Sequence, residues 1–460
     1  MPCQRGSIGD VYPELQEAVE GLKSKATLAE LTAASGEIGR SVGAKLVGEA
    51  LRQRAADPVK WPSCPRCGRT LRSKGFVSRE VGTLVGVVRW QRRVGRCPRR
   101  CKIGQIAPLD QALGLEGGQR TGWDMIRDAC ALAVFTPYET ASVLFNRLTA
   151  QTMSASAIWQ WVGRLGARAM AELTLELKAL ALGQEPALEA VDQSHQVLTL
   201  AVGVDGVMVP FRPVAGTPKG ATVWHEVKVG ILARLSHRVS RSGQSVGRCL
   251  HRRVVAVMGP IDALSERVWL EALRQGVRTA PRVVWLSDGA RGLWRIFSER
   301  FATLPNVVAI LDFYHAASHL AQVASAMAVG GPARAAKVWF QNARHILRHQ
   351  HPDDILDHLT NEIKRASKKP FTFLVLHQVQ RYLEAHKDHL DYERLKQLGL
   401  PIGSGLVESA CKWLIQQRFK GVGMRWDQDG FHHLLHLRLA WVNNRFDALF
   451  LAQTSLSPIS

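Results

Sequence analysis

From about residue 187 onward, the sequence consists of three strand-like runs followed by alternating helical and strand-like segments. The first three runs are VLTLAVGVDGVMVPFRP, HEVKVGILARLSH and HRRVVAVMG, and they are rich in Val, Ile and Leu. After them come a helical stretch (DALSERVWLEALRQG), the run VVWLS, a second helical stretch (ARGLWRIFSERF) and the run NVVAIL. Consecutive strands followed by alternation of strand and helix predict a mixed α/β sheet.

Helical segments are expected before and after this sheet in the sequence. Apolar residues recur at helical spacing over residues 10–57 and again from about 115 to 182. In the second region Pro137 starts one helix and Ser154 caps the next, which fits a helix-turn-helix, although a plain helical hairpin has the same pattern. Residues 315–400 are again predicted to be helical, and they are rich in Lys, Arg and His.

Four cysteines form two close pairs, Cys64-x2-Cys67 and Cys97-x3-Cys101. This paired spacing suits tetrahedral thiolate ligation of a structural Zn²⁺ ion. The runs between the pairs alternate in polarity as hairpin strands do, so we predict a zinc ribbon. Two disulfides or incidental cysteines are the alternatives. The first residues, MPCQRGSIGDVYPE, lack the apolar core of a secretory signal, which argues against an oxidising compartment.

The chain is strongly basic, with 60 Lys+Arg against 39 Asp+Glu and a net charge of +21. Such a charge favours a nucleic-acid partner. No apolar stretch reaches the roughly 18 uncharged residues of a membrane span, so we expect no membrane association. Basic residues crowd between Cys64 and Lys102, where Glu80 is the only acid. A solvated surface is the alternative, but the density of charge and the interleaved Trp90 and Phe76 favour phosphate contacts. The expected contacts are Arg92, Arg93, Arg99 and Arg100.

Two aspartates lie at the ends or within the strand-like runs. Asp288 directly follows VVWLS, and acids at the carboxyl ends of strands face the crevice where ligands bind; a helix N-cap is the alternative. Asp205 lies in an Asp-Gly pair between apolar runs, a pair that is also the preferred type I′ hairpin turn. Asp192, in VDQSH, is an alternative candidate to Asp205, but it lacks a matching downstream strand.

Two further acids lie nearer the end of the chain. Asp312 ends the run VVAIL, where a turn or a helix cap is the alternative. Glu408 follows a Gly-Ser-Gly turn at 403–405 and opens a helix, where a glutamate also favours the helix dipole. Carboxylates on separate elements can together hold two Mg²⁺ or Mn²⁺ ions about 4 Å apart, and such ions suit phosphodiester cleavage and transfer.

An ordered set of motifs resembles the ISKra-type insertion-sequence transposases. It consists of VGVDGVMVPFRP, WHEVKVGIL, WLSDGARGLW, LDFYHAASHL, LPIGSGLVESACK and RFKGVGMRW, and it spans roughly residues 60–450. The resemblance implies an RNase-H-like fold with a DDE metal site formed by Asp205, Asp288 and Glu408. The long gap before Glu408 then implies a helical insertion within the RNase-H-like domain.

The resemblance also implies auxiliary residues around these acids. Asp312-Phe-Tyr-His315 is similar to an acid-x-x-His motif of related transposases; His315 and His319 share a helix face, but structural histidines are common. His225 and Glu226 lie on a strand near the first acid and are possible supporting groups. Cations after Glu408 are expected to hold the phosphate backbone, with Trp413 and Trp426 either stacking on bases or packing in the core. These cations are Lys412, Arg418, Lys420 and Arg425.

The sequence thus predicts a multidomain α/β DNA transposase of cytoplasmic, nucleoid-associated location. It would bind double-stranded DNA at the ends of its own element and join them to target DNA, as a homodimer or higher oligomer. A domesticated DNA-binding protein without catalysis and a structure-specific nuclease on the same fold are the alternatives. The predicted segments are a helical N-terminal region (1–57), a zinc ribbon (58–108), a helix-turn-helix-like DNA-binding region (109–186), an RNase-H-like core (187–320), a helical insertion (321–400), the last part of the core (401–450) and a flexible tail (451–460).

Overall fold

The chain forms two compact units, which we describe separately. Unit 1 comprises Met1–Arg164 and Arg445–Ser460, and unit 2 comprises Leu165–Asn444. The predicted tail, Cys3 and the start of the predicted N-terminal helical region lie outside the described residues. The computed structural model describes residues 19–213, 221–239, 245–329, 331–366 and 369–450.

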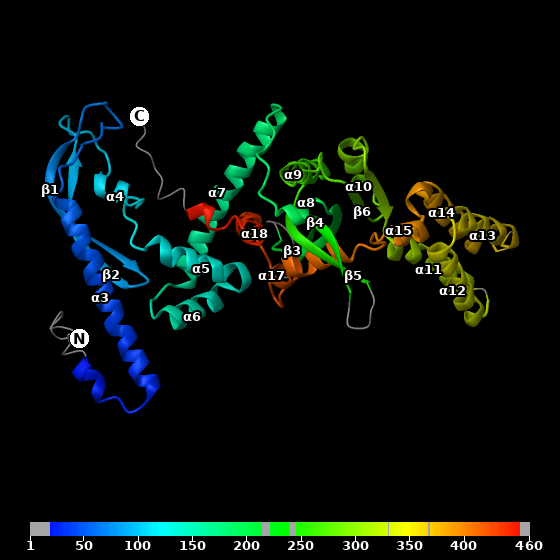
Figure 1. Cartoon of the computed structure of the whole chain (residues 1–460), viewed down its shortest axis with the longest axis horizontal. Helices are drawn as coiled ribbons and strands as arrows, with labels where there is room; N and C mark the ends of the chain where they lie inside the picture. Colours follow the sequence, from blue (N-terminus) through cyan, green and yellow to red (C-terminus); the bar gives the residue numbers. More distant parts are fainter. Residues whose placement is uncertain (1–18, 214–220, 240–244, 330, 367–368, 451–460) are drawn as a thin grey trace, which may run out of the picture. The chain divides into compact units, whose positions relative to one another are not determined.

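Unit 1 combines a two-stranded hairpin with helices (Figure 1). Its elements are α3 (Leu28–Ala56), β1 (Arg72–Thr83), β2 (Gly86–Arg96), α4 (Pro108–Ala112), α5 (Trp123–Phe135), α6 (Tyr138–Thr149) and α7 (Ala155–Ala181), which continues into unit 2.

The predicted hairpin between the cysteine pairs is confirmed, because β1 and β2 are antiparallel and close at Thr83 opposite Gly86. Trp90 of β2 is buried, so it belongs to the core of unit 1 and is not free to stack on a base. The two predicted helix starts are also found, with Pro137 as the N-cap residue of α6 and the Ser154 hydroxyl accepting from the Ala157 amide at 3.2 Å.

Unit 2 contains the predicted sheet and most of the helices. Its elements are α8 (Gln193–Gln196), β3 (Thr199–Phe211), β4 (Val223–Val239), β5 (Ser245–Val257), α9 (Ile261–Arg274), β6 (Val283–Ser287), α10 (Arg291–Ile296), the π-helix η1 (Phe297–Phe301), β7 (Val307–Leu311), α11 (Phe313–Val329), α12 (Ala333–His349), α13 (Pro352–Arg365), α14 (Pro370–Glu384), the 3₁₀ turn η2 (Lys387–His389), α15 (Tyr392–Gln397), α16 (Gly405–Ala410), the π-helix η3 (Cys411–Gln416), α17 (Gln417–Phe419) and α18 (Gln428–Val442).

The five strands form one mixed sheet in the order β5-β4-β3-β6-β7. Strand β4 is antiparallel to both β3 and β5, whereas β3, β6 and β7 run parallel to one another. The predicted mixed α/β sheet is therefore confirmed. Its first strand, β3, lies in the middle.

The central strands are buried on both faces, which explains their continuous apolar sequences. Successive side chains of a strand point to opposite faces. Val283 and Trp285 accordingly pack in a core with α9 and α10, while Val284 and Leu286 pack in a second core with α11 and the helices that follow it. Helices therefore cover both faces of β6, and its carboxyl end is left for a site.

Helices α11 to α15 lie in sequence between β7 and α16. Their apolar faces form one shared core, in which Leu320, Leu359, Leu376 and Tyr392 are fully buried. The Tyr392 hydroxyl donates to the Leu311 carbonyl at 2.9 Å, which fastens this core to the end of β7. Among the described helices, none combines the length and apolarity that crossing a bilayer requires.

Candidate functional site

The strand register places three predicted acids in one row. Val204 of β3 pairs with Ser287 of β6, which in turn pairs with Leu311 of β7. The next residue along each strand direction is Asp205, Asp288 and Asp312. Neighbouring strands lie about 4.8 Å apart, so the backbone positions of the three aspartates are adjacent, within β3 and just after the ends of β6 and β7.

Asp205 lies inside a strand and not in a turn. It pairs with Val229 of β4, and Gly206 pairs with Lys228, so the alternative prediction of a hairpin turn at this Asp-Gly pair is wrong. Two positions earlier on the same face of β3, a Cβ at Gly203 would lie 3.3 Å from Cβ of Val407. The face that carries Asp205 therefore packs against α16, the helix that contains Glu408.

Asp205 and Asp288 open into the same cavity, which has a volume of about 360 Å³. Glu226 and Lys228 of β4 line it as well, and their side chains form an ion pair of 2.8 Å. A Cβ at Gly206 would lie 2.3 Å from a carboxylate oxygen of Glu226, which shows how closely this side chain approaches β3. Glu226 was expected only as a supporting group, because nothing local in the sequence shows that β4 lies opposite Asp205.

The carboxylates of the row influence one another electrostatically. Burial raises the pKa of Asp205 above its ordinary value of 3.8, and the charges of Asp288, Asp312 and Glu408 raise it further, against a hydrogen bond from the Gly206 amide. Burial raises the pKa of the Cys411 thiol to about 12, with smaller contributions from Asp205 and Glu408. The site therefore concentrates negative charge that a cation would relieve.

Asp288 also organises the turn before α10, but it is not the helix cap of the alternative interpretation, because the N-cap residue of α10 is Ala290. Its carboxylate accepts from the Ala290 amide at 2.9 Å, and its carbonyl accepts from the Trp294 indole at 2.7 Å. The Trp294 ring stacks on His389 with centroids 4.4 Å apart. One carboxylate oxygen is thereby held in place, and the other is left for a ligand.

Asp312 is buried and ties two segments together. One of its oxygens accepts from the His315 amide at 2.5 Å, as a helix cap does, and the other accepts from the Ser404 amide. The Phe313 amide donates to the Ile402 carbonyl at 2.8 Å. Asp312 therefore fixes the turn that leads into α16. Asp312 and His315, the predicted acid-x-x-His pair, are therefore hydrogen-bonded through the backbone amide of His315 and not through its ring.

Glu408 lies in α16, where its exposed side chain forms an ion pair of 2.7 Å with Lys412. It does not line the cavity shared by Asp205 and Asp288. Among the described residues, only the cysteine cluster brings three or more ligand atoms within 4.8 Å of one another. The two aspartates and Glu226 place carboxylate oxygens, the ligand type that Mg²⁺ and Mn²⁺ prefer, along this cavity.

Tyr382 of α14 closes the other side of the Asp288 turn. Its hydroxyl is buried and has no hydrogen-bond partner among the described residues, and its ring lies on His319 with centroids 4.0 Å apart. Burial, followed by the charges of Asp288 and Asp312, raises the pKa of Tyr382, so the hydroxyl remains a donor at neutral pH. Nothing in the local sequence of α14 identified this residue.

Gly289 is required beside Tyr382, and Gly289→Ala is expected to destabilise unit 2. The added Cβ would lie 2.0 Å from the Tyr382 hydroxyl oxygen and 2.4 Å from its ring. Overpacking of this kind costs about 1–3 kcal/mol, which thermal denaturation detects as a lower midpoint. The double variant Gly289→Ala/Tyr382→Ala should recover part of the loss. An unchanged midpoint in the single variant would show that α14 does not press on this turn.

The predicted DNA-contacting residues differ in exposure. Arg92 is buried and binds Asp110 together with the Val77 and Ser78 carbonyls, so it holds unit 1 together and is not available to a phosphate. Arg418 is likewise buried, with its guanidinium 5.3 Å from the centre of the Trp426 ring.

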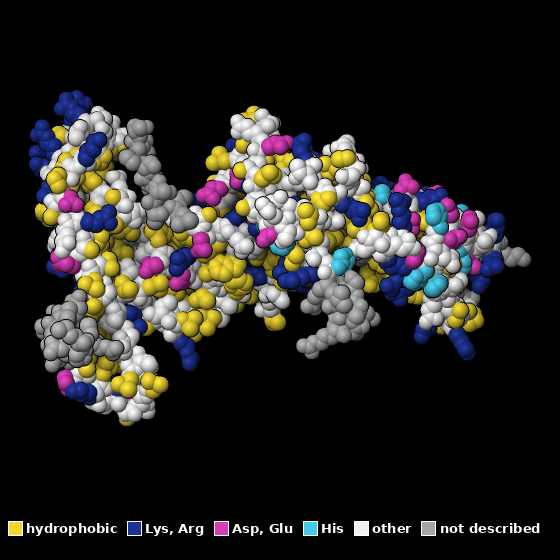
Figure 2. Space-filling view, viewed as in Figure 1, with side chains coloured by type: hydrophobic (Ala, Val, Ile, Leu, Met, Phe, Trp, Pro, Cys, Tyr) yellow, Lys and Arg dark blue, Asp and Glu magenta, His cyan; other side chains and the backbone are white. Residues whose placement is uncertain are grey.

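The remaining cations of this set lie at least partly at the surface, where phosphate contacts are possible. Arg93 and Lys420 are partly exposed, and they lie over the rings of Phe76 and Trp224, respectively. Figure 2 shows Lys and Arg side chains gathered over the part of unit 1 labelled β1 in Figure 1. The exposed members are Arg99, Arg100, Lys412 and Arg425.

The four paired cysteines form a cluster that can hold a metal ion. Their sulfur atoms lie within 4.8 Å of one another, and Cys67 and Cys97 are 3.5 Å apart. All described cysteines are free, so the alternative of two disulfides is wrong. The pairs lie on similar turns: the Gly68 amide donates to the Cys64 carbonyl, and the Arg100 amide donates to the Cys97 carbonyl, each at 2.9 Å.

Backbone geometry prepares these turns for ligation. Gly68 and Arg100 both have positive φ, of 70° and 55°, which lets the chain curl back around the sulfur atoms. The backbone amide of Cys101 lowers the pKa of Cys97 to about 6, which favours the thiolate form of this sulfur. Tetrahedral thiolate ligation is the chemistry of structural Zn²⁺.

Comparisons with known proteins add little. No protein-family model matches the chain, and no curated protein matches it in sequence. Among solved structures, it is similar to the Drosophila P element transposase strand transfer complex, with 10% identity, 72% of this chain and 94% of that chain covered, and a TM-score of 0.34. At this identity and TM-score the likeness decides nothing about the chemistry of this chain.

Proposed function

We propose that this protein is a DNA transposase that cuts the ends of its own insertion sequence and joins them to target DNA with Mg²⁺ or Mn²⁺ bound at the carboxylate row. The observation that carries the proposal is the convergence of Asp205 and Asp288, from neighbouring parallel strands, on one cavity. The resemblance of the ordered motifs to ISKra-type transposases agrees with it, as does the net charge of +21.

The sheet supports an RNase-H-like interpretation of unit 2. Its first strand is central, β4 is antiparallel to it, and acids follow the ends of β6 and β7. Glu408 comes from a helix that packs on the same face of β3 as Asp205, and it would be the third acid. The helices between β7 and α16 would be the helical insertion.

The residues of the site have separate tasks in this proposal. Asp205 and Asp288 would hold the divalent ions, and bound ions would supply activation of an attacking oxygen and stabilisation of the leaving oxygen of a phosphodiester. Lys228, whose ammonium donates to the Gly259 carbonyl at 3.1 Å, keeps Glu226 oriented at the cavity. Asp312 positions the turn before Glu408 through the Ser404 amide.

The DNA-binding surfaces and the assembly are further parts of the proposal. The exposed cations of the cysteine-rich segment, with zinc holding its two turns, would contact the element ends in double-stranded DNA. The helical pair α6 and α7 would act with them. Joining two ends requires a dimer or larger assembly, and a cytoplasmic, nucleoid-associated location follows from the substrate.

The test is strand transfer on labelled element-end DNA with Mn²⁺, comparing wild type with Asp288→Asn. Asparagine keeps the acceptor for the Ala290 amide but removes the charge that binds the ion. We expect joined product to fall by roughly a thousandfold, equivalent to about 4 kcal/mol of transition-state stabilisation. Asp357→Asn, which removes an exposed carboxylate of α13, is the control for the lost charge and should retain activity.

The other outcomes select between the alternatives. Cleavage without joining, and without a need for matched ends, would identify a structure-specific nuclease. DNA binding with no cleavage by wild type would identify a domesticated binding protein. Full activity in Asp288→Asn would overturn the choice of carboxylates.

A further inference from the structure

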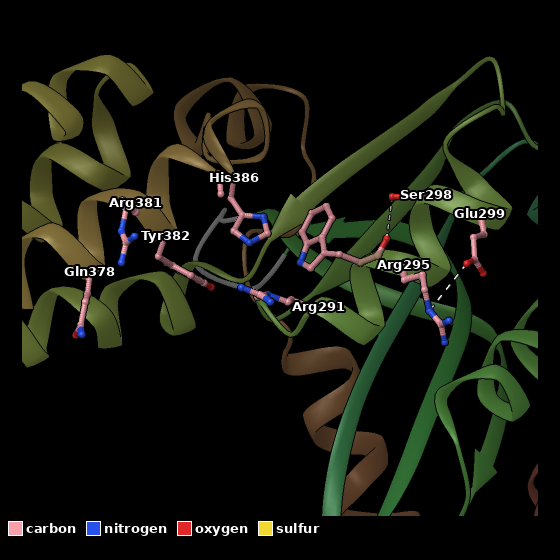
Figure 3. Close-up of a pocket in the computed structure, with 11 residues that line it drawn as sticks. Arg291, Arg295, Ser298, Glu299, Gln378, Arg381, Tyr382 and His386 are labelled. Carbon is pink, nitrogen blue, oxygen red and sulfur yellow. Dashed lines mark hydrogen bonds and ion pairs between the residues drawn. The ribbon is translucent and has the colours of Figure 1, made fainter.

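A second and larger cavity begins where the carboxylate row ends. It has a volume of about 960 Å³ and lies between the segment α10–η1 and helix α14; we call it the α10–α14 cavity (Figure 3). Gly289, the residue after Asp288, lines it, so the cavity and the acid site share one turn. Ser298, Glu299 and Gln378 at its margin are exposed, so the cavity is open to solvent.

The charges of the α10–α14 cavity favour an anion. Arg291 and Arg381 line it from opposite walls, and neither guanidinium has an ion pair or hydrogen bond among the described residues. Figure 3 shows the Arg291 guanidinium pointing toward Tyr382. Arg295, in contrast, is paired with Asp262 at 2.5 Å and with Glu299, an acid that also lines the cavity, at 3.9 Å. Unpaired arginines facing one cavity provide the planar donors that phosphate groups bind.

The cavity is also lined by flat side chains. One of them is Tyr382, whose hydroxyl is buried against Gly289 and has no hydrogen-bond partner among the described residues. His386 lines the same wall one helical turn further along. Aromatic rings beside cationic groups are the means by which proteins bind unpaired nucleotides.

We propose that the α10–α14 cavity binds single-stranded DNA that continues from the phosphodiester held at the carboxylate row. Arg291 and Arg381 hold phosphates of this strand. The proposal rests on the proposed function, because it identifies the strand by its continuity with the acid site. A cavity of this volume admits a single strand but not a duplex, and its open margin lets a polymer enter.

The test is DNA binding in EDTA, where no metal-dependent chemistry occurs. Fluorescence anisotropy compares a labelled blunt duplex with the same duplex carrying a short oligothymidine extension. We expect Arg291→Ala/Arg381→Ala to weaken binding of the extended duplex about tenfold and to lower its salt slope by about 1.4, because each single-strand phosphate contact contributes about 0.7. Binding of the blunt duplex should be unchanged.

Two further variants sharpen the result. Tyr382→Phe removes only the hydroxyl, which is buried against Gly289, and should change binding of the extension by no more than about twofold. Arg334→Ala removes an exposed arginine of α12, outside the cavity, and is the matched control for charge. It should change neither affinity by more than about twofold, the range of an exposed substitution.

The outcomes that contradict the proposal are distinct. If Arg291→Ala/Arg381→Ala loses affinity equally for the blunt and the extended duplex, the arginines are general duplex contacts and the proposal is overturned. Displacement of the extension by free deoxynucleoside monophosphate alone would assign the cavity to a free nucleotide, which also overturns it. Because the assay needs no catalysis, Asp288→Asn should still bind the extension. If Asp288→Asn still carries out strand transfer while Arg291→Ala/Arg381→Ala still weakens binding of the extended duplex, only the proposed function is contradicted.

Discussion

Replacing Asp205 with Asn is expected to abolish cleavage and joining while raising the thermal unfolding midpoint. The carboxylate lies in a row with Asp288 and Asp312, and burial followed by its neighbours' charges disfavours its ionised form in the folded protein. Asparagine keeps the shape and the acceptor for the Gly206 amide. Loss of a metal ligand should lower the rate by roughly a thousandfold, whereas loss of the charge removes repulsion.

The pH dependence of this gain in stability has a definite sign. Because the folded pKa of Asp205 is raised above 3.8, the folded protein holds the proton more tightly than the unfolded chain does. Its contribution to stability is fully present below pH 3.8 and is lost as the pH rises through the folded pKa. The midpoint of Asp205→Asn should therefore exceed that of wild type increasingly as the pH rises above 3.8.

Mn²⁺ should have the opposite effect on the unfolding midpoints of wild type and Asp205→Asn. An ion that binds only the folded state raises the unfolding midpoint, so wild type should gain stability with Mn²⁺ and Asp205→Asn should gain much less. Asp192→Asn is the matched control, because Asp192 is the competing first acid but is an exposed cap of α8. Equal responses to Mn²⁺ in wild type and Asp205→Asn would show that Asp205 holds no ion.

Replacing Cys64 with Ser is expected to remove bound zinc and to unfold the cysteine-rich segment of unit 1. Around the cluster, Trp61, Leu71 and Ile106 form only a small apolar core. Zinc binding contributes about 10–16 kcal/mol in isolated zinc-finger peptides, which is as large as the stability of a whole domain. The segment should therefore depend on its metal. The measurements are zinc content by mass spectrometry and the fluorescence of Trp61, which packs against Gly95.

The controls separate ligation from general cysteine loss. Cys249→Ser makes the same chemical change on β5, outside the cluster, and should retain the zinc content of wild type. Chelation of wild type should reproduce the Cys64→Ser spectrum and weaken binding of duplex DNA. If Cys64→Ser keeps its zinc and its fluorescence, the cluster is not a metal site.

Local patterns were enough to predict several elements. The alternating runs between the cysteine pairs predicted β1 and β2, and Pro137 and Ser154 marked the starts of α6 and α7 correctly. Each of these signals acts within a few residues, through side-chain alternation or through capping of free backbone amides. Short-range physics of this kind is visible in a single sequence.

Other local patterns predicted the wrong structure or gave no prediction. The Asp-Gly pair at Asp205 suggests a turn, but β4 pairs with both residues and keeps them extended. The position of Arg92 in a basic run suggests a DNA contact, but Asp110 binds its guanidinium inside unit 1. No local sequence pattern indicated that Tyr382 lies beside Asp288. In each case the deciding partner is remote in sequence or comes from another element.

The sequence by itself determined the classes of element, the paired thiols and the excess of positive charge, because each depends on composition or on near neighbours. Only the tertiary structure decided how the acids are arranged. Strand register places Asp205, Asp288 and Asp312 in one row, and packing of α16 on β3 brings Glu408 to the same face. Folding also placed Arg291 and Arg381 along one cavity, where neither has an acidic partner among the residues that the structure describes.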